Sequence, residues 1–222
     1  MGATNCPETP RQRMIGMMYL VLTAMLALNV SKDILNAFTV VNETLVNSTS
    51  ITNQGISTFE QKLAKEKASQ GEAKVKQAEM MVNQIVRESD ALVAYIEKLK
   101  VDLLIAVDGT EKNKEGKLKT ANDISSKDNI SKVTNFMFGP DKKAVQLKKK
   151  IEAYRNNLLK MVVKPEDRKT LDQTIGLEIN GKYTNNDKKL ESWETHYFDR
   201  QIMVAAYTLL NKTIGEIRNA QS

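Results

Sequence analysis

The chain has 222 residues, of which 27% are charged and 5% aromatic, with four prolines and a formal net charge of +6. This is a helical composition, and the chain is long enough for a substantial core. A single cysteine, Cys6, excludes an internal disulfide. The densest basic run, residues 141–150, has no interleaved aromatic residues, so we expect no nucleic-acid partner.

The first predicted element is an apolar helix near the N-terminus. Residues 14–30 carry no formal charge, and as a helix they span about 25 Å, near the ~30 Å of a bilayer core. A cleaved signal peptide has a shorter apolar region, and a buried soluble helix usually contains more polar residues. Arg11 and Arg13 precede the run, and short basic flanks stay cytoplasmic. The predicted segments are a cytoplasmic N-terminus, a single transmembrane helix and an outer domain, at residues 1–13, 14–31 and 32–222.

A row of residues at steps of four shares one face of this helix. Arg11, Ile15 and Tyr19 supply a cation and a hydroxyl on that face. Thr23 and Ala27 continue the row with small side chains, which permit close helix contact in a membrane. Within an assembly the row suits a partner helix with an acidic group, because opposite charges in lipid are stabilised by pairing. The simpler interpretation of Arg11 is a topology signal with no further role.

Two long helices are predicted to begin the outer domain. Apolar residues from Ile34 to Leu63 recur at helical spacing and predict one helix to about Lys67, with a weak point at residues 48–55. Gly71 separates it from a second helix that ends at the turn signal after residue 107. The positions of a narrow helix-packing seam in this second helix are Val75, Ala78, Val82, Ile85, Ser89, Leu92, Ile96, Leu99, Leu103 and Ala106.

Two polar connections and two more helices complete the predicted fold. Residues 110–140 lead to a third helix, and residues 180–189 lead to a fourth that starts near Ser192, after a short helix at residues 166–177. The apolar positions of the third helix are Leu147, Ile151, Tyr154, Leu158 and Met161, and those of the fourth are Phe198, Ile202, Ala205 and Leu209. We therefore predict an all-α protein with one transmembrane helix followed by a four-helix bundle.

The connectivity of such a bundle raises a question of direction. Four helices that alternate up and down return residue 222 toward the membrane. One long connection, residues 110–140 or residues 163–189, has to cross the bundle if the chain is to leave on the other side.

The chain carries no motif typical of an enzyme. It has no Gly-rich phosphate loop, no Cys or His ligand pair and no nucleophile motif. Its one histidine, His196, lies near Glu191, Glu194 and Asp199, which suggests either a metal site or a general base. A structural histidine near the caps of a helix is the simpler interpretation. We expect no catalytic residue, no metal and no cofactor.

Four stretches near the N-terminus carry a resemblance to a known family. They are Pro-Arg-Gln-Arg-Met-Ile at 10–15, Met-Tyr-Leu-Val at 18–21, Ala-Met-Leu-Ala-Leu-Asn-Val-Ser at 24–31 and Ile-Leu-Asn-Ala-Phe at 34–38. These stretches resemble the start of the GldM (PorM) family, inner-membrane proteins of Bacteroidetes gliding motility and type IX secretion. The helical outer domain is similar to the family's first periplasmic domain in general character. Family members are longer, so the chain is expected to lack their later β-rich domains and the contacts with outer components.

The resemblance implies a mechanical role in the bacterial inner membrane, with the bulk of the chain in the periplasm. Family members work with the membrane protein GldL, and two GldM helices inside a ring of GldL subunits form a motor driven by the proton motive force. The family's N-terminal arginine, which opposes a GldL glutamate, corresponds to Arg11, and its membrane tyrosine corresponds to Tyr19. The resemblance thus also implies a homodimer of this chain.

Two other functions compete with the motor. A chemoreceptor-like sensor with a periplasmic four-helix bundle needs a second membrane span after the bundle, and residues 213–222 offer none. A passive anchor with a helical spacer is the third interpretation, and its membrane face would tolerate substitution.

Overall fold

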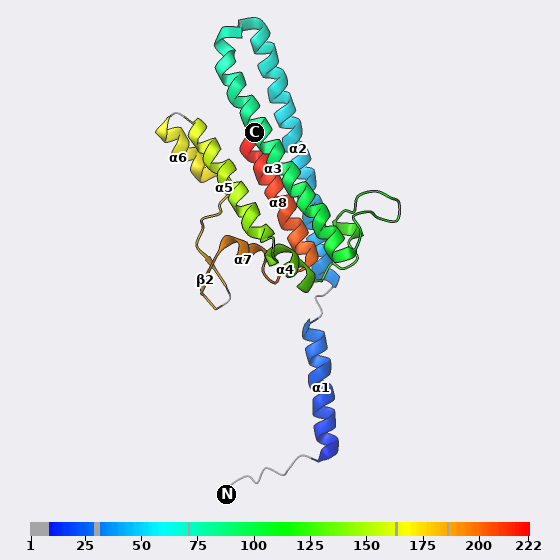
Figure 1. Ribbon diagram of the computed structural model, residues 1–222. Coiled ribbons are helices and arrows are strands. Elements are labelled where there is room, and N and C mark those ends of the chain that lie inside the picture. Colours follow the sequence, from blue (N-terminus) through cyan, green and yellow to red (C-terminus); the bar gives the residue numbers. More distant parts are fainter. Residues whose placement is uncertain (1–8, 29–31, 71, 163, 186) are drawn as a thin grey trace.

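The computed structural model describes residues 9–28, 32–70, 72–162, 164–185 and 187–222 (Figure 1). Over these residues the chain is mostly helical, which confirms the predicted all-α class. The elements in chain order are α1 (Pro10–Leu28), α2 (Lys32–Gln70), α3 (Glu72–Asp108), the 3-10 helix η1 (Ala121–Asp123), α4 (Ser131–Phe138), α5 (Lys143–Met161), α6 (Pro165–Thr174), β1 (Tyr183–Thr184), β2 (Leu190–Glu191), α7 (Trp193–Phe198) and α8 (Met203–Gln221).

The helices α2 and α3 form a long antiparallel pair that agrees with the first two predicted helices (Figure 1). α3 ends at Asp108, where the predicted turn follows with Gly109 at φ +78°. Gly71 and the side chains of Val75 and Ala78 lie outside the described residues. Of the other predicted seam positions, the buried ones are Ser89, Leu92, Ile96, Leu99 and Leu103, the partly buried ones are Val82 and Ile85, and the exposed one is Ala106.

The predicted weak point of α2 is helical throughout. Its threonines donate their hydroxyls to the carbonyl four residues earlier, as Thr49 does to Leu45 at 2.8 Å. Such bonds satisfy the hydroxyls but add little helix stability. Contacts with α8 stabilise this part of the helix; for example, Thr52 Oγ1 donates to Asn219 Oδ1 of α8 at 3.0 Å. Packing against α8 thus overrides the poor local propensity of residues 48–55.

The helix α8 packs along α2 and runs in the same direction. Asn211 Nδ2 donates to Asn42 Oδ1 at 2.6 Å in a buried contact. Farther toward the C-terminal end of both helices, Thr52 Oγ1 donates to Asn219 Oδ1. The C-terminal end of α8 therefore lies part-way along α2, on the side away from α1 (Figure 1). Because α8 runs parallel to α2, the chain does not return toward α1 at residue 222.

Of the two long connections, residues 163–189 are the one that crosses from one end of the fold to the other. α5 runs antiparallel to α3, because Tyr154 pairs with Ser89 at 2.7 Å while Lys150 lies over the ring of Tyr95. α6 then turns back along α5, and the chain descends through residues 175–191 to α7 before α8 starts upward (Figure 1). Residues 163–189 therefore bring the chain back to the end at which α2 begins, which we call the base.

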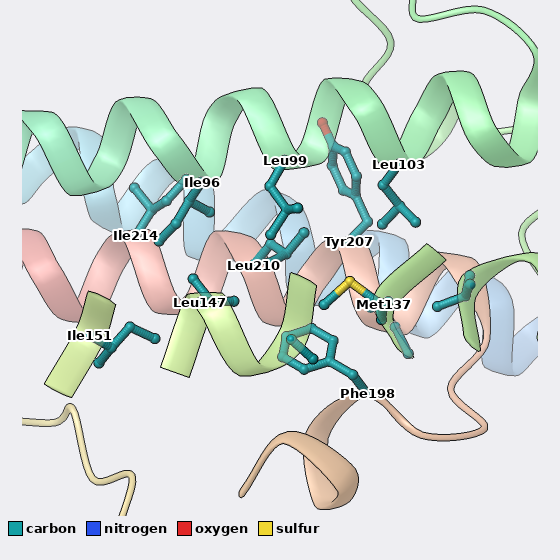
Figure 2. Packing of buried hydrophobic residues seen from close by; sticks show 14 of the residues in the cluster. Ile96, Leu99, Leu103, Met137, Leu147, Ile151, Phe198, Tyr207, Leu210 and Ile214 are labelled. Atoms are coloured by element: carbon teal, nitrogen blue, oxygen red, sulfur yellow. The ribbon is translucent and has the colours of Figure 1, made fainter. Parts of the chain in front are cut away.

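The core lies between α3, α5 and α8, and α4 and α7 close it at the base (Figure 2). Ile96 and Leu99 project from α3 toward Ile214 and Leu210 of α8, and Leu103 lies beside Tyr207 (Figure 2). The other large buried side chains in this view are Leu147 and Ile151 of α5, Met137 of α4, Phe198 of α7 and Tyr207 of α8. The apolar face predicted for the third helix is therefore confirmed for its buried members, Leu147, Ile151, Tyr154 and Leu158, whereas Met161 is partly exposed.

A buried ion pair holds the first connection against the end of α3. The carboxylate of Asp108 accepts hydrogen bonds from Lys119 Nζ at 2.8 Å and from the backbone N–H groups of Ser125 and Ser126, both at 2.9 Å. The exposed fraction is 0% for the Asp108 side chain and 7% for that of Lys119. Burial raises the pKa of Asp108, but the hydrogen bond from Lys119 and the two backbone donors outweigh it and lower the pKa. The carboxylate thus organises this connection in its ionised form.

Several details differ from the predicted fold. The strands β1 and β2 form an antiparallel hairpin in the second polar connection, where no strand was expected. The predicted fourth helix is divided into α7 and α8 near Arg200, which has φ +55°. α2, α5 and α8 run in one direction and α3 in the other, and the predicted four-helix bundle is not confirmed. Among the described residues, no helix combines the length and apolarity that a membrane span requires.

Candidate functional site

The candidate site is α1, whose first residues fix where the helix starts. Gln12 Oε1 accepts hydrogen bonds from the backbone N–H and from the hydroxyl of Thr9, both at 3.1 Å. Thr9 Oγ1 in turn accepts from the N–H of Gln12 at 3.4 Å, which completes a reciprocal cap. Pro10 takes the first helical position, where a missing N–H costs no hydrogen bond. The cap therefore places Arg11 in the first turn.

Four of the predicted site residues form an exposed row on α1. Arg11, Ile15, Tyr19 and Thr23 lie at steps of four, and each is exposed. Thr23 Oγ1 donates to the backbone carbonyl of Tyr19 at 2.5 Å, so the threonine hydroxyl is satisfied within the helix. Ala27 belongs to the same helix, but its side chain lies outside the described residues. The row is thus available to a partner, and what it binds stays a prediction.

The apolar side chains of α1 surround the helix rather than forming one face. Residues 14–22 make about two and a half helical turns. Their large apolar side chains are each more than half exposed, namely Met14, Ile15, Met17, Met18, Tyr19, Leu20, Val21 and Leu22. A helix that is apolar on all sides is typical of a buried or membrane-embedded segment. The exposed surface of α1 therefore calls for a covering environment, either lipid or protein.

The histidine that suggested a metal site links α7 to the hairpin instead. His196 Nδ1 lies 2.8 Å from Glu191 Oε1 at the end of β2, and its ring stacks on Tyr183 of β1 with centroids 4.9 Å apart. Glu194 pairs with Lys148 of α5 at 3.1 Å and is therefore directed elsewhere. No cluster of three potential metal ligands occurs among the described residues. The structural interpretation of His196 fits this geometry, although the residue lies in the last turn of α7 rather than at its start.

Comparison with known protein families gives one match. The chain matches the GldM N-terminal domain over residues 33–222. The chain belongs to the GldM family. GldM proteins are membrane-associated components of the gliding and type IX secretion machinery, and they are not a known enzyme family. The match begins at residue 33, so it rests almost entirely on residues outside the N-terminal resemblance. A search of curated proteins gave no match.

In this GldM domain, sequence reasoning missed an exposed and uncharged face on α2. From Ile34 to Phe59 only Glu43 is charged, and its carboxylate accepts a hydrogen bond from Asn122 at 2.5 Å. Of the large apolar side chains about half or more exposed on this stretch, Val40, Val41, Ile51 and Phe59 lie within about 100° of one another around the helix and form this face, whereas Ile34 and Val46 lie farther round. The low charge is visible in the sequence and could have marked this face as an interaction surface.

Proposed function

We propose that this chain is the membrane-anchored drive component of a motor powered by the proton motive force, which serves type IX secretion and gliding motility and transmits motion into the periplasm. The observation that carries the proposal is α1, an exposed apolar helix with Arg11 and Tyr19 on one face, in a member of the GldM family. The N-terminus lies in the cytoplasm, and the chain beyond about residue 31 lies in the periplasm.

The first step concerns the anchor. The 19 residues of α1 make a helix of about 28 Å, and the proposed span continues into residues 29–31, which lie outside the described residues. Arg11 and Arg13 are in the first turn, where a cation opposes the helix dipole at a cost of about 0.3–1 kcal/mol. Helix stability therefore does not account for two arginines at this place, whereas cytoplasmic orientation does.

The second step concerns coupling to the ion gradient. We place the row on α1 against GldL-like membrane subunits, with a carboxylate of the partner opposite Arg11 and the hydroxyl of Tyr19 beside it. Ile15, Thr23 and Ala27 supply the packing surface, since small side chains permit close helix contact. Moving one charge through 100 mV is worth about 2.3 kcal/mol, several times the thermal energy. A change of charge at this pair is therefore sufficient to bias the position of one helix against another.

The third step concerns assembly and transmission. A homodimer of the chain would cover the uncharged α2 face, whose Val40 and Ile51 are 61% and 69% exposed. α2 is one helix from the base to its far end, and α8 packs parallel to it through the Asn42–Asn211 and Thr52–Asn219 contacts. Rotation of α1 would thus act on a stiff arm that runs away from the membrane.

Thiol labelling in spheroplasts tests the proposed topology. Cys6 is the only cysteine and lies in the proposed cytoplasmic segment, outside the described residues. A membrane-impermeant maleimide should label Cys6 only after the membrane is permeabilised. The matched protein carries Cys6→Ser and Lys114→Cys, which moves the thiol to the exposed first connection, and it should react without permeabilisation. The reverse pattern would exclude the proposed orientation and the motor with it.

A further inference from the structure

The segment that follows α6 is extended and fixed in place by alternate side chains. Ile175, Leu177 and Ile179 are buried, whereas Gly176 and Glu178 between them are exposed. Ile175 has φ −68° and ψ 114°, in the extended region. An alternation of buried and exposed residues is the pattern of a strand with one face on a core. Here the surface beneath the segment is helical, so its edges face no neighbouring strand of a sheet.

Apart from one carbonyl, the backbone of this segment has no hydrogen-bond partner among the described residues. None of the N–H groups of residues 176–180 donates to another described residue, and the only carbonyl that accepts is that of Glu178, from Tyr183 Oη at 2.7 Å. The segment runs along the outer side of the molecule between α6 and the hairpin (Figure 1). Unpaired N–H and C=O groups in an extended row are a template for another extended chain.

A cavity of about 220 Å³ opens beside the same segment. It lies between residues 176–179, α5, α7 and α8, and the aromatic side chains that line it are Tyr183, Trp193, Tyr197 and Phe198. The charged residues in its wall are Glu178 and the pair formed by Lys212 and Glu216, whose Nζ and Oε1 lie 2.6 Å apart. An apolar cavity of about 150 Å³ already accommodates a benzene ring. The cavity is therefore large enough for one aromatic side chain.

We infer that this edge binds an extended peptide segment of a partner protein as an added strand, with one phenylalanine-like side chain in the cavity. The row of backbone groups selects an extended chain, because only another extended backbone matches its spacing. The four aromatic side chains of the wall select an aromatic ring at the position that faces it. This surface lies on α5, α7 and α8, away from the α1 row and the α2 face, so the inference is independent of the motor.

Nuclear magnetic resonance on the whole chain in detergent tests the inference with a defined probe, the blocked peptide acetyl-Thr-Val-Phe-Val-Thr-amide. In a strand, successive N–H groups point to opposite edges, so pairing protects alternate residues only. At a peptide concentration ten times Kd, hydrogen exchange should slow roughly tenfold in one alternate set, residues 176, 178 and 180 or residues 177 and 179. Replacing the peptide's phenylalanine with alanine should weaken binding about ten- to a hundredfold.

A variant pair tests the cavity from the protein side. Leu209 lines the cavity, and Leu209→Phe should fill it and abolish peptide binding. The matched variant is Leu118→Phe, at an exposed leucine in the first connection, and it should bind as the unmodified chain does. Absence of protection at millimolar peptide, protection of all five amides, or equal affinity for the phenylalanine and alanine peptides would overturn the inference. The two peptides decide the matter even if Leu209→Phe does not fold.

Discussion

Replacing Asp108 with alanine should destabilise the outer domain by about 3–5 kcal/mol. The magnitude follows from the buried groups that lose the carboxylate as their hydrogen-bond partner. Lys119 would stay buried without its partner, and the N–H groups of Ser125 and Ser126 would lose their acceptor, whereas an exposed pair would contribute about 1 kcal/mol or less. Because the Asp108 side chain is 0% exposed, water does not compensate the loss within the folded state.

Urea unfolding in a mild non-ionic detergent measures this loss. The single tryptophan, Trp193, is buried in the core and reports tertiary unfolding by fluorescence, and circular dichroism reports helix content. The double variant Asp108→Ala, Lys119→Met should recover part of the loss, because it removes the stranded cation. Comparison of the single and double variants separates the ion pair from the two backbone bonds.

The change of stability with pH tests the same interaction. The pKa of Asp108 is lowered in the folded chain, so its contribution is fully present above its ordinary pKa of about 3.9 and is lost as the pH falls through the folded value. The unmodified chain should therefore lose more stability on acidification below about pH 4 than Asp108→Ala does. A loss of less than 1 kcal/mol at pH 7, or parallel acid curves for the two proteins, would refute the reasoning.

Two further predictions concern packing and assembly. Leu99→Ala, in the core seam of α3, should lower the free energy of unfolding by about 2–5 kcal/mol in the same urea assay. The control Leu118→Ala, at an exposed leucine, should change it by no more than about 0.5 kcal/mol. Equal effects of the two variants would contradict the assigned core. We expect the proposed homodimer in analytical ultracentrifugation of the unmodified chain. Ile51→Glu on the α2 face should then give a monomer, whereas Ile105→Glu, at an exposed isoleucine of α3, should leave the sedimentation unchanged. A dimer that persists in Ile51→Glu would exclude this face as the interface.

The local part of the fold could be predicted from the sequence, and the long-range part could not. The seam of α3 was visible because its spacing of three and four is unbroken, and Asp108-Gly109 marks its end. The same rule joined α7 and α8 into one helix, since apolar spacing continues across Arg200 and periodicity does not detect a residue with positive φ. The parallel course of α2 and α8 is seen from contacts such as Asn42–Asn211 and Thr52–Asn219, which join residues 169 and 167 positions apart. No local pattern carries that information.

The candidate site was likewise predictable only in its local part. The row from Arg11 to Thr23 follows from helical spacing alone, and the cap of Thr9 and Gln12 explains where the helix starts. The cavity beside residues 176–179 was not predicted, because its walls come from α5, α7 and α8 and meet only in the folded chain. The extended segment itself is readable in retrospect as Ile175, Leu177 and Ile179 at steps of two.

Replacement of Arg11 with alanine in the cells that produce this protein tests the central claim most directly. If Arg11 pairs with a partner's carboxylate, its loss strands that group, which then binds a proton and stops the ion-coupled cycle. Arg11→Ala should therefore abolish secretion and gliding while expression, orientation and copurification with the proposed GldL-like membrane subunits persist. Arg13→Ala is the matched control and should retain both activities, and Tyr19→Phe should be milder than Arg11→Ala. Normal secretion and gliding in Arg11→Ala cells would contradict the motor assignment of this residue, and loss of copurification would make Arg11 a structural contact instead.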